Sequence, residues 1–552
     1  MSNTTQQPVS HKKQSVIAGA LTGSAGVFLT KAIGLLYVIP FKKMAGESTV
    51  FYSYAYTIYD YALQICLSGL PFAIAALVSK YVAKNDYKAV RMVRRISLMV
   101  LMLFGFICCT ALILFSRPFA LLVIPSGVTD DYVQKTQTVL IIVSFALIAV
   151  PLLSYYRGVY QGFKEIGTYA FTQVLEQLIR VAFLLGASAI CLYAFHLDQI
   201  WAAYMGVVST SVSALATIIY FVIYDRRYVA SLPADSGETE ATNKSILKEL
   251  IGYAVPYLIS SVVANSSNLF ILLMLATGLE KHGTDPYLIT TYQGIINYEA
   301  YKLTSIPQVI ATGFSLALVP HITEAVTKED KAQVRSMIQK ILETVNYLAV
   351  PVTFFMIFFA REIYYIMYGN SSLDVGAFIL ARALIIELLW IVVMVLSSIL
   401  AALKLRKVYV GLSLLQLVFV TTTLVFWLGQ FGVDGYFICK TIEFTTFIVI
   451  AVIFIEKHYN PSIRQIFDNC SLSWLALLPM LIIVAILAQL HFDITLQSRL
   501  VTLLYTGVMF VLIIGLYFVI SAKFNIPQRL FSVEISRDSI SNLLARIFKR
   551  KK

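Results

Sequence analysis

The chain has 552 residues, of which 59% are hydrophobic and only 13% are charged, and its mean hydropathy is +0.78. This composition excludes an ordinary soluble globular protein, and recurrent apolar runs of about 20 residues are typical of a polytopic helical membrane protein rather than of a membrane β-barrel. The net charge of +13 does not indicate a nucleic-acid-binding protein, because the basic residues lie in short loops between apolar runs.

In chain order, the apolar runs predict about 14 membrane spans, and the first should remain in the mature protein because it lacks a signal-peptide cleavage pattern. The predicted spans cover residues 15–39, 51–82, 96–115, 138–156, 169–195, 200–224, 246–277, 292–322, 338–359, 376–403, 408–429, 436–455, 474–490 and 500–521. Most basic loops fall on one side of this arrangement, including Arg157 and Lys164 after the fourth span. We therefore expect both termini in the cytoplasm.

We expect an all-α fold of two six-helix bundles with an extra C-terminal helix pair. The predicted parts are a cytoplasmic N-terminus at 1–14, an N-lobe at 15–224, a cytoplasmic linker at 225–245, a C-lobe at 246–456, the extra pair at 472–521 and a basic tail at 522–552. The tail places apolar residues on one helical face, which favours a short helix lying on the anionic inner leaflet. A disordered basic tail is the alternative.

An internal repeat supports the two bundles. The loop after the second span matches the loop after the eighth span at a constant offset of 244 residues. The matched pairs are Val82 with Val326, Lys84 with Lys328, Asp86 with Asp330, Val90 with Val334, Arg91 with Arg335 and, upstream, Gly69 with Gly313. Because a cytoplasmic loop matches a cytoplasmic loop, the two halves should be parallel repeats.

Two lysines lie inside predicted spans, where a charge costs about 3 kcal/mol or more unless it faces a wet cavity or a partner. Lys31 lies in the first span, and Lys302 lies in the eighth together with Pro307 and Pro320. Either lysine alone could extend its ammonium group to the membrane interface. Two lysines at similar depth favour a shared cavity that faces an anion.

Further charged residues in the spans are candidates for cavity or ion-coupling roles, or for partners of one another. They are Asp60, Glu176, Arg180, Glu299, Glu387, Lys440 and Glu443. Glu176 and Arg180 lie one turn apart and are interpreted first as a self-neutralising pair that supports the structure. The aromatic run at 51–61 indicates an interfacial belt, and a wall that stacks on sugar rings is the alternative.

No catalytic constellation emerges from the sequence. The six histidines are spread singly, and the six cysteines lack metal-ligand spacing. A Gly-rich phosphate-binding loop is also missing from the sequence. We therefore expect neither an enzyme nor a cofactor or metal site, and the sequence leaves the identity of any coupling ion open.

Several segments resemble the multidrug/oligosaccharidyl-lipid/polysaccharide exporter superfamily, and more closely its polysaccharide-biosynthesis and MurJ-type flippases of Gram-positive bacteria. These segments are Lys31–Leu35, Gly69–Pro71, Tyr155–Gly162, Ala300–Leu303 and Leu318–Pro320. The resemblance implies that Lys31 and Lys302 line a central cationic cavity that handles the pyrophosphate of lipid II. It also implies that the last two spans form a groove for the isoprenoid tail. The chain departs from the family in carrying Lys in place of Arg at both positions and in lacking a second cation shortly after Gly34.

The resemblance thus implies a flippase that moves lipid II, the undecaprenyl-pyrophosphate-linked peptidoglycan precursor, from the inner to the outer leaflet of the bacterial plasma membrane by alternating access. The expected partners are this lipid-linked glycan, membrane lipids and cell-wall synthesis proteins, but not nucleic acid. Two alternatives remain open: a flippase for another undecaprenyl-linked polysaccharide precursor, and a cation-coupled multidrug exporter.

Overall fold

The computed structural model describes residues 29–531, apart from residues 31–32, 69, 164, 231–238, 240, 310–321, 323–324, 327, 404 and 490–493. The described part of the chain consists of helices, turns and short connections and contains no strand, so the all-α prediction is confirmed. Some predictions fall outside the described residues: those for Lys31, for Gly69, Gly313 and Pro320, for the N-terminus at 1–14, for part of the linker and for most of the tail.

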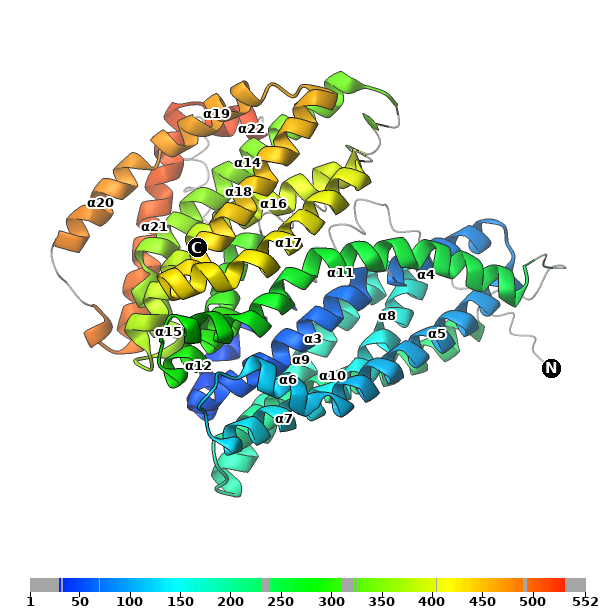
Figure 1. The fold of residues 1–552 in the computed structure, drawn as a ribbon. Coiled ribbons are helices and arrows are strands. Elements are labelled where there is room, and N and C mark those ends of the chain that lie inside the picture. Colours follow the sequence, from blue (N-terminus) through cyan, green and yellow to red (C-terminus); the bar gives the residue numbers. More distant parts are fainter. Residues whose placement is uncertain are drawn as a thin grey trace, which may run out of the picture. The chain divides into compact units, whose positions relative to one another are not determined.

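Figure 1 shows the helices with the labels used below. The first part of the chain contains α2 (Val38–Ala45), α3 (Thr49–Ser68), α4 (Leu70–Ala83), α5 (Tyr87–Leu114), α6 (Ser116–Val123), α7 (Asp130–Ser144), α8 (Ala146–Gly162), α9 (Ile166–Ala189), α10 (Ile200–Ala230), α11 (Asn243–Lys281) and α12 (Pro286–Gly294). The later part contains α14 (Lys331–Phe358), α15 (Ala360–Tyr368), α16 (Leu373–Ala402), α17 (Arg406–Phe431), α18 (Val433–Tyr459), α19 (Ile463–Leu475), α20 (Leu478–Gln489), α21 (Arg499–Lys523) and α22 (Ile526–Phe531).

Within the described residues, 10 helical stretches are long and apolar enough to cross a membrane. One of them, Asp130–Gly162, combines α7 and α8, which meet at a turn at Phe145. The chain is therefore a polytopic membrane protein, as predicted. The total of about 14 spans stays a prediction.

The described chain forms two compact units. The first unit comprises the described residues up to Tyr298 together with Ser413–Tyr436, and the second comprises Glu299–Leu412 together with those from Phe437 onward. Helices α11 and α12 thus belong to the first unit. The lobe boundaries proposed from the sequence stay predictions.

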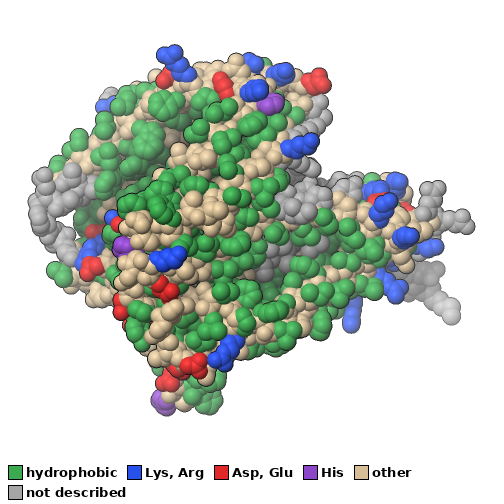
Figure 2. Space-filling model, viewed as in Figure 1, with side chains coloured by type: hydrophobic (Ala, Val, Ile, Leu, Met, Phe, Trp, Pro, Cys, Tyr) green, Lys and Arg blue, Asp and Glu red, His purple; other side chains and the backbone are tan. Residues whose placement is uncertain are grey.

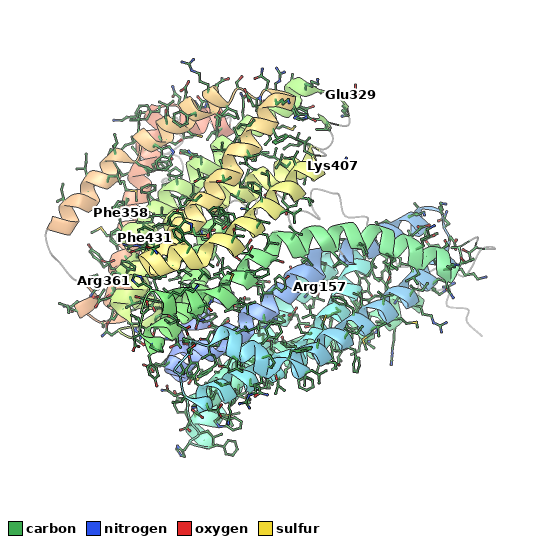
Figure 3. The ribbon with its side chains drawn as sticks, in the orientation of Figure 1. Arg157, Glu329, Phe358, Arg361, Lys407 and Phe431 are labelled. Carbon is green, nitrogen blue, oxygen red and sulfur yellow. The ribbon has the colours of Figure 1, made fainter. Side chains whose placement is uncertain are left out.

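The repeat predicted from the sequence extends to the backbone. Asn85 and Glu329, which is labelled in Figure 3, both have left-handed backbones, with φ of 56° and 57°. The next residues, Asp86 and Asp330, each cap a helix by accepting a hydrogen bond from the backbone N–H three residues later. Both helices, α5 and α14, then run for 28 residues. The two turns and the starts of the helices that follow them therefore have the same local structure.

Helix α8 approaches α4 closely in the first unit because two of its glycines face α4. A Cβ atom at Gly158 would lie 2.9 Å from the Cα and the carbonyl oxygen of Pro71, and one at Gly162 would lie 2.6 Å from Cβ of Val78. A larger residue at either position would have to displace the neighbouring helix. This close contact fixes the position of the end of α8, which carries a charged residue described below.

A polar network joins α5, α8 and α10 in the same unit. Arg94 forms an ion pair with Asp225, and their side chains are 11% and 18% exposed. The hydroxyl of Tyr160 donates to Asp225 at 2.8 Å, and Nε of Arg94 donates to the hydroxyl of Tyr155 at 3.3 Å. Figure 2 shows hydrophobic side chains along the first unit and basic ones near the end where α11 begins, as a membrane-spanning bundle requires.

Candidate functional site

Three charged side chains meet inside the first unit, where α8 contacts α9. Nη2 of Arg157 donates to Oε2 of Glu176 at 2.6 Å, and Nη2 of Arg180 donates to Oε1 of the same carboxylate at 2.6 Å. The side chains of Arg157, Glu176 and Arg180 are 4%, 11% and 13% exposed. Figure 3 labels Arg157 among the helices of this unit. We call these three residues the arginine–glutamate cluster; two guanidinium groups share one carboxylate, so its net charge is positive.

Tyrosine rings border the arginine–glutamate cluster. Nη2 of Arg180 also donates to the hydroxyl of Tyr59 at 3.0 Å, and the guanidinium lies 5.5 Å from the centre of that ring. The guanidinium of Arg157 lies 5.9 Å from the centre of the Tyr169 ring. Such cation–π contacts stabilise a guanidinium where water is scarce.

The cluster belongs to a polar face of α9 (Ile166–Ala189) that extends to the middle of this helix. The residues on this face, spaced by three or four positions, are Tyr169, Gln173, Glu176, Gln177 and Arg180. Arg180 lies in the middle of the 28-residue candidate span Gly167–Ala194. Gly34, in the first predicted span, faces the same helix, because a Cβ atom there would lie 3.3 Å from Nε2 of Gln177.

Arg157 lies in a buried helical end and not in the predicted loop. The hydropathy pattern ends the fourth span at Tyr156 and assigns Arg157 to a cytoplasmic loop, but α8 continues to Gly162 and buries Arg157 beside Glu176. Hydropathy misses this helical end because its residues are polar or small, while tertiary packing keeps it helical. The sequence gives no signal for this third member of the cluster, because Glu176 already has a partner in Arg180 four residues later.

The tyrosines of α3 also differ from the predicted interfacial belt. Tyr52, Tyr54 and Tyr59 are at most 2% exposed. The hydroxyl of Tyr54 donates to Oε1 of Gln293 at 2.7 Å, and the ring of Tyr52 packs edge-on against Tyr298 with centres 5.2 Å apart. The belt prediction is wrong for these three residues, because their hydroxyl groups and rings find partners inside the first unit.

In the second unit, Glu299 is a buried acid three residues before Lys302. Glu299 is 3% exposed; its carboxylate accepts a hydrogen bond from Tyr364, and its backbone carbonyl accepts one from Tyr368 at 2.9 Å. It lies in the π-helical turn Ile295–Ala300, a distortion that is frequent at functional sites. Lys302 follows on a helix and is partly exposed.

The remaining candidates include one tight pair. Nζ of Lys440 donates to Oε2 of Glu443 at 2.7 Å, and both residues are buried. Glu387 is buried on α16, and Asp60 is partly exposed on α3. Among the residues that the structure describes, no group of three or more His, Cys, Asp or Glu side chains could hold a metal ion. The cavity and coupling roles of these residues stay predictions.

An apolar cavity of about 490 Å³ lies within the second unit, between α14 and α16 and beside Trp474 of α19. Its lining is almost entirely hydrophobic, and Asn346 contributes an amide. Nδ2 of Asn346 has no hydrogen-bond partner among the described residues. The cavity therefore suits an apolar chain better than a sugar.

Comparison with known proteins assigns the chain to a family. The polysaccharide biosynthesis protein family matches residues 16–326, which is more than half of the chain. The chain belongs to this family. The match covers the predicted N-lobe, the linker and the segment that carries Lys302.

Two relatives of this polysaccharide biosynthesis protein come from Bacillus subtilis (strain 168). The lipid II flippase MurJ is 27% identical over 465 residues, which are 81% of this chain and 84% of that protein. Stage V sporulation protein B is 26% identical over 364 residues, which are 65% of this chain and 68% of that protein.

A solved structure has the same fold as the described chain. It is a lipid II flippase MurJ in an inward closed conformation, and it superposes with a TM-score of 0.67 at 13% identity, covering 93% of this chain and 100% of that chain. The resemblance to MurJ-like members of the exporter superfamily, inferred from the sequence, is confirmed by the family match, the relatives and this fold.

Proposed function

We propose that this polysaccharide biosynthesis protein is a flippase that moves lipid II from the inner to the outer leaflet of the bacterial plasma membrane. The observation that carries the proposal is the similarity to the lipid II flippase of Bacillus subtilis, because it extends over 81% of the chain and 84% of that relative. A match over most of both chains favours a shared transport activity over a shared segment.

The chemistry of the substrate explains why such a protein needs buried cations. The pyrophosphate and sugars of lipid II cannot cross about 30 Å of hydrocarbon unaided, because they would lose their hydration. A lysine or arginine in a protein cavity offsets that loss through charge-assisted hydrogen bonds. In our proposal Lys31 and Lys302 supply this positive charge. Glu299, three residues before Lys302, partly offsets the charge of Lys302, which weakens the binding of the anion enough for it to leave.

The isoprenoid chain needs no polar path, since it can remain in lipid or in apolar protein surroundings. The cavity of about 490 Å³ between α14 and α16 offers such surroundings within the second unit. Alternating access then exposes the polar site to one leaflet at a time. In this account both termini lie in the cytoplasm.

A second candidate function is the transport of another undecaprenyl-linked polysaccharide precursor. The family description and the similarity to stage V sporulation protein B over 65% of the chain favour it. The two candidates share the pyrophosphate and differ in the glycan. They are distinguished by the intermediate that accumulates when the protein is depleted.

The test is to deplete the protein in its host, in a strain without a redundant flippase, and to measure lipid II in each leaflet. We expect lipid II to accumulate in the inner leaflet and to return to its normal distribution when the wild-type chain is supplied. An unchanged distribution of lipid II, together with accumulation of a different lipid-linked glycan, would replace the first candidate by the second. An unchanged distribution of every such precursor would contradict both.

A further inference from the structure

We propose that the arginine–glutamate cluster of Arg157, Glu176 and Arg180 is an anion-binding site, and that its ligand is a diphosphate. The inference deepens the proposed function and rests on it for the identity of the carrier lipid. It assigns the recognition of the diphosphate partly to α8 and α9.

The charge of the cluster is the first argument. A neutral Arg–Glu pair would serve a structural role at this depth, because it leaves no uncompensated charge in the membrane. Here a second arginine is added, and within the described residues both arginines form ion pairs with Glu176 alone. An excess positive charge in the middle of a span is costly, so it indicates a function that uses the charge.

The unused hydrogen-bond donors are the second argument. Each guanidinium donates through Nη2 to Glu176, and neither Nε of Arg157 nor Nε of Arg180 has an acceptor among the described residues. Arg157 is only 4% exposed, so water does not readily replace the missing acceptor. Two forked guanidinium groups with free N–H donors match the oxygens of a phosphate or diphosphate.

The arrangement of the cluster is the third argument. The shared carboxylate holds both guanidinium groups in place before a ligand arrives, which reduces the ordering cost of binding. Arg180, whose side chain is 13% exposed, is more accessible than Arg157, so an incoming anion would meet Arg180 first. The polar face of α9, with Gln173 and Gln177, continues from this point.

The experiment uses the full chain in nanodiscs of phosphatidylcholine, which lack competing anionic lipids. Binding is measured as the shift in the thermal unfolding midpoint on titration with inorganic pyrophosphate or with farnesyl pyrophosphate. We expect Arg157→Gln and Arg180→Gln each to weaken binding at least about tenfold. The matched control is Arg95→Gln, which removes one positive charge from an exposed position of α5 and should leave the affinity unchanged.

Glu176→Gln separates an anion site from a structural cluster. If the cluster binds anions, the amide oxygen of the glutamine still holds a guanidinium group by accepting a hydrogen bond, while the net charge of the cluster rises, so pyrophosphate should bind more tightly. If the cluster is only structural, Glu176→Gln lowers the unfolding midpoint without any gain in affinity, and that result would overturn the proposal. Arg157→Lys keeps the positive charge but loses the two-pronged geometry of the guanidinium group, so it should bind pyrophosphate more weakly than the wild type. This comparison remains possible if the glutamine variants fold poorly, and an affinity equal to that of the wild type would count against the proposal.

The two ligands identify the source of the diphosphate. Equal, arginine-dependent binding of both would indicate the diphosphate group itself, and selective binding of farnesyl pyrophosphate would indicate a lipid headgroup. Equal binding by the wild type, Arg157→Gln and Arg180→Gln would overturn the anion site even if depletion traps lipid II. Arginine-dependent binding without any effect of depletion on lipid-linked glycans would refute the proposed function and retain the site.

Discussion

At the scale of single residues, buried charges are neutralised in two different ways. Lys440 and Glu443 form an ion pair on one helix. Glu176, in contrast, accepts hydrogen bonds from two guanidinium groups, one on its own helix α9 and one on α8. The first arrangement leaves no net charge, and the second leaves one positive charge. The difference is the reason to assign ligand binding to the second.

Lys302 provides the first prediction at this scale. Lys302→Gln should abolish complementation of a depleted strain, because the glutamine side chain cannot offset a pyrophosphate charge, and Lys302→Arg should retain most activity. Lys43→Gln, at an exposed position, is the matched control. Growth, protein level and leaflet distribution of lipid II are measured together. Full activity of Lys302→Gln at a normal protein level would remove Lys302 from the proposed site.

Asp225 provides a prediction about stability. Asp225→Asn leaves Arg94 largely buried without its carboxylate, so we expect a loss of at least about 2 kcal/mol in the free energy of unfolding. Asp131→Asn breaks an exposed ion pair with Lys135 and should change it by less than about 0.5 kcal/mol. Thermal unfolding of the purified variants compares them. Similar midpoints for both would show that the network with Asp225 is dispensable.

At the scale of the elements, the sequence predicts the repeat well because the repeat is local. The turn before α5 and the turn before α14 each contain a residue with a left-handed backbone, followed by an aspartate that caps the helix. Because both turns need the same cap, the sequence has aspartate at both positions, Asp86 and Asp330. Helix ends that depend on distant packing are harder to predict. The helix end that holds Arg157 was misplaced because its apolar character is low and the glycines that pack it against α4 act only in three dimensions.

The close contact of α8 with α4 predicts that adding one methyl group to α8 lowers stability. Gly158→Ala should lower the free energy of unfolding by about 1–3 kcal/mol, because its Cβ would meet backbone atoms of Pro71 at 2.9 Å. Gly186→Ala in α9 is the matched control; its Cβ would meet nothing within 4 Å, so it should be neutral or slightly stabilising. An equal effect of the two substitutions on the unfolding midpoint would refute the close packing.

At the scale of the whole molecule, composition and hydropathy are sufficient to predict a polytopic helical membrane protein. They do not predict which helices group together, because the division depends on contacts between distant segments. The first unit includes α11 and α12 as well as Ser413–Tyr436 from late in the chain. Likewise, the pair of Glu176 and Arg180 could be predicted from a spacing of four residues, but their association with Arg157 could not.

The measurement that tests the central claim most directly uses the purified chain in proteoliposomes with fluorescent lipid II. Translocation is measured as the loss of protection of the labelled headgroup from a membrane-impermeant quencher. We predict that the wild type moves lipid II much faster than protein-free vesicles do, and that Lys302→Gln reduces the rate to near that background. If the wild type moves lipid II no faster than empty vesicles, while a control flippase is active under the same conditions, the proposed function is contradicted.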